Sequence, residues 1–118
     1  MTPFGRRLRE LRRERGIALK DMAKALDVSS AYLSALEHGH RGRPTRPMVH
    51  GICAYLNIIW DDAEELQELA RLSHPRVVVD TAGLSPAATE LANRLAERIA
   101  KLDKETIARL LAALDGKG

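Results

Sequence analysis

Residues 16–39 read GIALKDMAKALDVSSAYLSALEHG, and this stretch decides the fold. Two short segments with helical apolar periodicity meet there at a polar turn, residues 27–29. The Ser29 hydroxyl is placed to accept a hydrogen bond from the next helix, which therefore begins at Ser30. Such a pair of helices is typical of a helix-turn-helix DNA reader. The apolar positions expected to face the common core are Ile17, Met22, Ala23 and Leu26 in the first helix and Leu33 and Leu36 in the second.

Three further helices are predicted around this stretch. Thr2-Pro3 reads as the cap and first turn of a helix that runs to about Arg15. Another helix begins near Thr45 and stops at Asn57, and a third runs from Trp60 to residues 73–75, where a proline follows. The core positions expected from spacing are Phe4, Leu8, Leu11, Val49, Ile52, Cys53, Leu56, Ile58, Ile59, Leu66, Leu69, Ala70 and Leu72.

The central stretch resembles the lambda-repressor-like (XRE-type) helix-turn-helix family, whose pattern reads roughly G-L-T-Q-x-x-L-A-x-x-L-G-V-S-x-x-Y-I-S-x-I-E-x-G. The resemblance covers about residues 4–72 and implies an all-α, five-helix DNA-binding domain. Ala18 and Leu19 depart from the pattern, because the family has a capping Thr and a DNA-backbone Gln there. Asp27 replaces a turn glycine, and Asp tolerates the left-handed region better than most residues. The direct matches are Gly16, Ala23, Leu26, Val28, Ser29, Tyr32, Ser34, Glu37 and Gly39.

The resemblance implies that the helix from Ser30 to His38 enters the major groove of double-stranded DNA. It also implies a structural ion pair between Arg12 and Glu37. The loop after Gly39 reads HRGRPTRP, and its arginines are expected along the DNA backbone or in the minor groove. The residues expected to touch DNA are Ser29, Ser30, Ala31, Tyr32, Ser34, Ala35, His40, Arg41, Arg43 and Arg46.

Charge divides the chain into two unequal parts. Residues 1–46 hold 11 Lys and Arg against 5 Asp and Glu, whereas residues 47–118 hold 8 against 11. Cationic side chains that neutralise phosphates release counterions, so the basic part is expected to face a polyanion. The acidic part is then available to another protein.

The chain after Pro75 is interpreted from physical patterns alone. Residues 75–84 form a linker, with a short strand at residues 76–80 as the alternative, paired to a second subunit. Residues 85–118 carry two apolar helical stripes, so the predicted domains are 1–74 and 85–118. Those stripes either fold back on the core or form a dimer interface, and dimerisation is favoured. The predicted interface comprises Val77, Val78, Val79, Leu84, Leu91, Leu95, Ile99, Leu102, Ile107, Leu110, Leu111 and Leu114.

The predicted function is that of a DNA-binding transcriptional regulator, a homodimeric repressor of a palindromic operator. The alternative is an antitoxin or anti-activator that holds a partner protein and regulates its own operon. No enzyme, metal or cofactor is expected, because the four histidines lack recognisable metal spacing and no phosphate-binding loop is present. A cytoplasmic location is expected, since no apolar run approaches a membrane span or a signal peptide. The single cysteine, Cys53, is expected to be a buried thiol.

Overall fold

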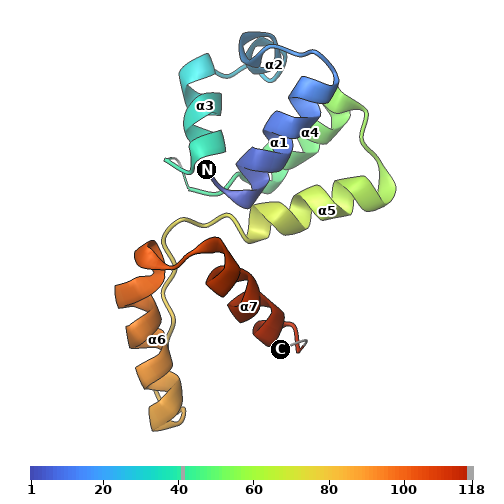
Figure 1. The fold of residues 1–118 in the computed structure, drawn as a ribbon. Coiled ribbons are helices and arrows are strands. Elements are labelled where there is room, and N and C mark those ends of the chain that lie inside the picture. Colours follow the sequence, from blue (N-terminus) through green and yellow to red (C-terminus); the bar gives the residue numbers. More distant parts are fainter. Residues whose placement is uncertain (41, 117–118) are drawn as a thin grey trace. The chain divides into compact units, whose positions relative to one another are not determined.

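The computed structural model describes residues 1–40 and 42–116, and every regular element in this part of the chain is a helix (Figure 1). The all-α class predicted from the sequence is therefore confirmed. The chain divides into two compact units, and the boundary lies between Val77 and Val78. The first unit contains α1 (Pro3–Glu14), α2 (Leu19–Ala25), α3 (Ser30–His38), α4 (Arg46–Leu56) and α5 (Trp60–Arg71).

Side-chain caps fix the start of three of these helices. Thr2 Oγ1 accepts a hydrogen bond from the Gly5 N–H at 3.0 Å and begins α1. Ser29 begins α3 in the same way, and Thr45 Oγ1 accepts from the Met48 N–H at 3.3 Å to begin α4. These are the starts predicted from the sequence. Each cap satisfies a backbone donor that the first helical turn leaves without a partner.

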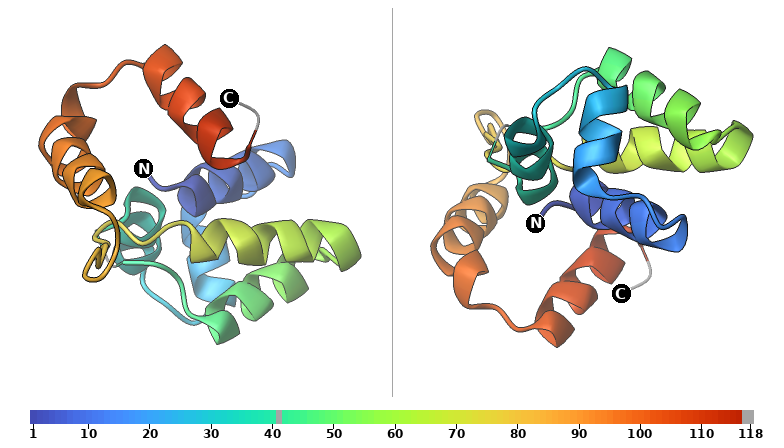
Figure 2. Two further views of the ribbon diagram at one scale, coloured as in Figure 1. Left: turned by 90° about the horizontal axis from the view of Figure 1, so that it is seen from below. Right: turned by 90° about the horizontal axis from the view of Figure 1, so that it is seen from above.

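All five helices of the first unit, α1 to α5, contribute side chains to its core. Helix α1 packs against α3 and α5, while α2 packs against α3 and α4 against α5 (Figure 2). The predicted stripes supply the buried side chains, so periodicity alone located most of the core. The completely buried members include Phe4, Leu8, Met22, Leu33, Val49 and Ile52.

Three predicted core positions were wrong or incomplete. Ile59 is 63% exposed, because it is the extended residue before α5 and its neighbour Ile58 takes the inward position. Leu72 is 55% exposed, since α5 ends at Arg71 and the periodicity no longer applies beyond it. Ile17 packs against the core but precedes α2, which begins only at Leu19.

The second unit contains α6 (Pro86–Arg98), the short 3-10 helix η1 (Ile99–Lys101) and α7 (Lys104–Leu114). Ser85 caps α6 and Asp103 caps α7. Residues 76–80 form no strand within this chain. Neither α6 nor α7 has a buried residue, although both carry an apolar stripe. An amphipathic helix is stable only when its stripe is covered, so these two helices lack a core of their own.

Candidate nucleic-acid interface

The turn between α2 and α3 sets the orientation of α3 on the core. Asp27 has a φ of 58°, a left-handed conformation that Asp adopts more readily than most residues. Ser29 then caps α3, its Oγ accepting a hydrogen bond from the Tyr32 N–H at 3.0 Å. Leu33 and Leu36 anchor the inner side of α3 in the core. The opposite side of α3 is therefore the side that faces solvent.

The solvent side of α3 is lined by short side chains. Ser30 and Ala31 are exposed, and Ser34 and Ala35 are half-buried. Tyr32 is also half-buried and packs against the core. Hydroxyls and methyl groups offer weak readout of base edges, because the strong bidentate contacts to bases come from Arg, Lys, Asn and Gln. This surface therefore carries few strong hydrogen-bonding groups.

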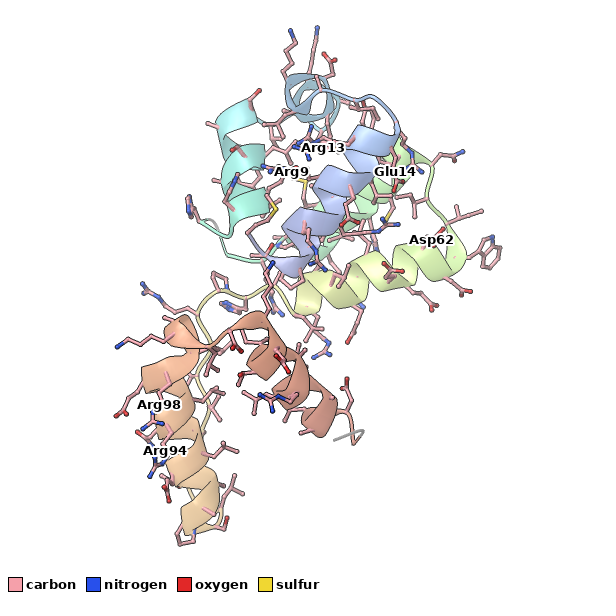
Figure 3. The ribbon with its side chains drawn as sticks, in the orientation of Figure 1. Arg9, Arg13, Glu14, Asp62, Arg94 and Arg98 are labelled. Carbon is pink, nitrogen blue, oxygen red and sulfur yellow. The ribbon has the colours of Figure 1, made fainter. Side chains whose placement is uncertain are left out.

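A buried carboxylate holds the carboxyl end of α3 against α1. Glu37 is only 1% exposed, and its two oxygens lie 3.3 Å from Arg12 Nε and 3.5 Å from Arg12 Nη2. Arg12 also donates from Nη1 to the Ile17 carbonyl at 3.2 Å, which joins α1 to the segment before α2. Arg9 Nε lies 3.8 Å from Glu37, and Figure 3 shows Arg9 and Arg13 on the side of α1 nearer to α3. The pair that the resemblance implies is thus part of a three-residue cluster.

Backbone proximity strengthens this junction. A Cβ placed on Gly5 would lie 1.9 Å from the Glu37 carbonyl oxygen, so α1 approaches α3 as closely as a glycine allows. The Thr2 N–H donates to that same carbonyl at 3.3 Å. Gly39 ends α3 with a φ of 83°, a left-handed conformation typical of a helix stop. These contacts fix the orientation of α3 on the core.

The loop after α3 brings cationic side chains beside the start of α4. Arg43 and Arg46 are exposed, while Pro44 between them is buried. They line an open hollow of about 700 Å³ that also touches α5, where Arg71 contributes a third cation. Arg71 donates hydrogen bonds to Glu68, and this interaction lowers the pKa of the Glu68 carboxyl. Arg41 lies outside the described residues.

The histidines at the end of α3 are exposed and adjacent. His38 Nδ1 lies 2.9 Å from the Ser34 carbonyl oxygen, and the ring centres of His38 and His40 are 6.1 Å apart. Within residues 1–40 and 42–116 no group of three or more His, Cys, Asp or Glu side chains is arranged to hold a metal ion.

None of the described helices is long and apolar enough to cross a membrane.

The structure also reveals residues that sequence reasoning missed. The sequence pattern did not indicate a role for Gly5, because that role depends on the approach of a helix distant in the sequence. Ser73 is buried, and its Oγ accepts a hydrogen bond from the Phe4 N–H at 2.9 Å, which ties the end of α5 to α1. Arg9 was detectable in principle, since it precedes Arg12 by three residues on the same helix.

Leu19, one of the two departures from the family pattern, has a structural role. It is half-buried and packs against the core at the start of α2. Ala18 occupies the cap position and provides no side-chain hydrogen bond. The start of α2 is therefore held by apolar packing rather than by a cap.

Comparison with known proteins agrees with this geometry. The helix-turn-helix domain family matches residues 3–69. The uncharacterized HTH-type transcriptional regulator RghRB of Bacillus subtilis (strain 168) is 37% identical over 62 residues, which are 52% of this chain and 45% of that protein. The HTH-type transcriptional regulator DdrOP3 of Deinococcus deserti is 44% identical over 59 residues, 50% of this chain and 45% of that protein.

The matched segments thus cover about half of this chain and less than half of each relative. No solved structure matches the chain. Both relatives are named as HTH-type transcriptional regulators. Since the family match spans α1 to α5 almost completely, this chain belongs to the helix-turn-helix domain family.

Proposed function

We propose that this protein is a sequence-specific regulator of transcription that binds double-stranded DNA in the cytoplasm. The observation that carries the proposal is the solvent side of α3, where Ser30 and Ala31 are exposed, together with the loop after α3, where Arg43 and Arg46 are exposed. A helix of this kind fits the major groove, and flanking arginines fit the phosphate backbone.

The proposed contacts divide into two groups with different roles. Side chains of α3 read base edges through hydroxyls and methyl groups, whereas loop side chains neutralise phosphates or enter the minor groove. Because the α3 side chains are short, sequence preference depends strongly on how easily the site deforms. The first group is Ser29, Ser30, Ala31, Tyr32, Ser34 and Ala35, and the second is His40, Arg41, Arg43 and Arg46.

The second unit supplies the dimer interface in this proposal. Its apolar stripe is exposed in the single chain, with Leu91 at 61%, Leu95 at 40% and Ile99 at 54%. A second copy would cover these stripes and remove them from water, which is favourable at about 25 cal/mol per Å² of apolar area. Two copies related by a two-fold axis would present their α3 helices about 34 Å apart to a palindromic operator. Binding of such a dimer across a promoter would repress transcription.

A second candidate function rests on the same exposed stripe. A partner protein that covers α6 and α7 would make this chain an antitoxin or anti-activator that also regulates its own operon. The purified chain distinguishes the two functions by its mass in solution. A dimer supports the repressor. A chain that stays monomeric as its concentration is raised supports the second function, in which another protein covers the stripe.

The test begins with selection of duplexes from random DNA by the full chain, followed by a salt titration of the selected duplex. Arg43→Ala should reduce the slope of log affinity against log salt by about 1, the value expected for one lost phosphate contact. Arg109→Ala removes the same charge from exposed α7 and should leave the slope unchanged. Leu91→Asp should weaken binding to the palindrome and yield monomers. No selected sequence, or equal slopes for the two arginine variants, would refute the proposal.

A further inference from the structure

Three consecutive valines are exposed in the segment that joins the two units. Val77 is 70% exposed, Val78 is 95% exposed and Val79 is 67% exposed. Residues 77–80 belong to no helix, turn or bend (Figure 1). Flexible linkers are usually rich in glycine and serine, whereas β-branched side chains are enriched in strands. The segment therefore has the composition of a strand without a partner strand among the described residues.

The backbone of this segment is also free to pair. Residues 76–80 form no backbone–backbone hydrogen bond with any part of the chain that the structure describes. Free N–H and carbonyl groups of this kind can pair with a strand from another chain. The pairing would be limited at both ends. Pro75 has no N–H to donate, and Asp80 Oδ1 accepts a hydrogen bond from the Ala82 N–H at 2.9 Å, which turns the chain.

The two ends of the segment carry charges of opposite sign. Residues 76–80 read RVVVD, and neither Arg76 nor Asp80 forms an ion pair with a described residue. A parallel copy of this segment would place like charges opposite each other, which is destabilising. An antiparallel copy that pairs Val78 with itself places Arg76 of each copy opposite Asp80 of the other. The segment therefore complements itself in one orientation and one register.

We infer that residues 77–79 pair with the same residues of a second copy as a two-stranded antiparallel ribbon, whose two-fold axis passes beside Val78. The inference rests on the proposed function, because it adds an element to the proposed dimer. A two-fold interface uses one patch twice, and a self-complementary strand meets that requirement. Side chains alternate between the two faces of a strand, so Val77 and Val79 of both copies form one apolar face. Val78 of both copies lies on the other face, between the two Arg–Asp pairs.

So short a ribbon needs support from the rest of the dimer. A two-stranded pair is marginally stable in water by itself. The apolar stripes of α6 and α7 in the proposed dimer would hold the two segments at high effective concentration, which makes their pairing effectively intramolecular. The Thr81 and Thr89 hydroxyl oxygens are 2.9 Å apart, so the end of the segment is tied to the start of α6. Association of the helices therefore brings the two segments together.

A cysteine at the axis tests the pairing directly. Cys53, the only cysteine of the chain, is first replaced by alanine. Directly opposed residues of an antiparallel pair have Cα atoms about 4.5–5.5 Å apart, a separation that suits a disulfide. Val78→Cys should therefore yield a covalent dimer under mild oxidation with diamide.

The matched control is Ala82→Cys, which places a thiol at another exposed position of the same segment. The ribbon puts the two copies of residue 82 beyond its opposite ends, so this variant should stay uncrosslinked. Equal crosslinking of the two variants overturns the inference, because it indicates an unpaired or parallel segment. A dimer of the Val78→Cys variant that does not crosslink also overturns it.

Charge exchange tests the register. Arg76→Asp and Asp80→Arg each create two like-charge pairs across the axis, and each should weaken dimerisation about ten-fold in analytical ultracentrifugation. An equal mixture of the two variants should form heterodimers and recover most of the lost affinity, because one copy then carries two acids and the other two arginines. Arg43→Asp makes the same charge change at an exposed position of the first unit and should leave dimerisation unchanged. A mixture that dimerises no better than the separate variants overturns the inference.

The outcomes also separate this inference from the proposed function. A chain that binds its selected duplex as a dimer without the Val78→Cys crosslink overturns the inference alone. A chain that selects no duplex but forms the crosslink overturns the proposed function alone. A chain that stays monomeric at every concentration overturns both the ribbon and the proposed dimer.

Discussion

Two glycine-to-alanine substitutions should have opposite effects on stability. Gly5 and Gly51 both lie inside helices, α1 and α4. A Cβ at Gly5 would lie 1.9 Å from the Glu37 carbonyl oxygen and 2.6 Å from its carbonyl carbon, whereas a Cβ at Gly51 would meet only Leu26 Cδ2 at 3.5 Å. The first contact is impossible without moving a helix, and the second is an ordinary van der Waals contact.

The magnitudes follow from these contacts. Gly51→Ala should raise the free energy of unfolding by about 0.5–1 kcal/mol, the usual helical advantage of alanine over glycine. Gly5→Ala gains the same advantage, but α1 must shift by about 1 Å or more to restore an allowed distance. Overpacking of a core typically costs about 1–3 kcal/mol, and a backbone obstacle that cannot rotate away should exceed this. We expect a net loss above about 3 kcal/mol.

Urea unfolding of both variants of this chain, followed by circular dichroism at 222 nm, measures both changes. A stability change of 1 kcal/mol moves the melting temperature of a unit of this size by about 4–8 °C, so thermal unfolding provides a second reading. Gly51→Ala controls for the general effect of alanine in a helix. A Gly5→Ala variant as stable as the original chain would show that α1 and α3 are not in the close contact described above.

Three further predictions concern the same unit. Arg12→Leu should lower the free energy of unfolding in urea by about 3–5 kcal/mol, because it leaves the Glu37 carboxylate buried without its main partner. The double variant with Glu37→Leu should recover most of that loss. Ser29→Ala should cost about 1 kcal/mol by removing the α3 cap, whereas Ser30→Ala, one residue later and without a capping bond, should change stability little. Burial raises the pKa of the Cys53 thiol, so only the unfolded chain ionises readily near its ordinary pKa. Stability should therefore decline as the pH rises above that value, and Cys53→Ala should abolish this part of the pH dependence in unfolding measured between pH 7 and 10.

Local patterns predicted the helices well because their signals lie within a few residues. Thr2, Ser29 and Thr45 each stand directly before a helix and each accept the expected backbone hydrogen bond. Periodicity failed where a helix ended, as at Leu72, or where the chain turned, as at Ile59. In both places the inward direction depends on backbone geometry that spacing cannot supply.

Contacts between distant segments were harder to predict. The Gly5 approach to Glu37 and the Ser73 hydrogen bond to Phe4 join residues separated by tens of positions. Nothing in the local sequence marks them, because glycine and serine are common for many reasons. The α3 candidates for DNA contact came from the family resemblance, and the loop arginines came from the composition of the loop. The structure adds the exposure of Ser30, Ala31, Arg43 and Arg46, and the hollow beside Arg43.

The short side chains of α3 require that the orientation of this helix be fixed. Serine and alanine reach base edges only if the helix backbone lies deep in the groove, so a small tilt of α3 would remove those contacts. The tilt is set on the inner side of α3, by the Gly5 approach and by the buried Glu37 that Arg12 and Arg9 neutralise. Variants at Gly5 or Arg12 that still fold should therefore lose discrimination between DNA sequences before they lose phosphate-driven affinity. A long side chain on α3 would tolerate such a tilt, since its rotamers can compensate, whereas the side chains of Ser30 and Ala31 are too short to do so.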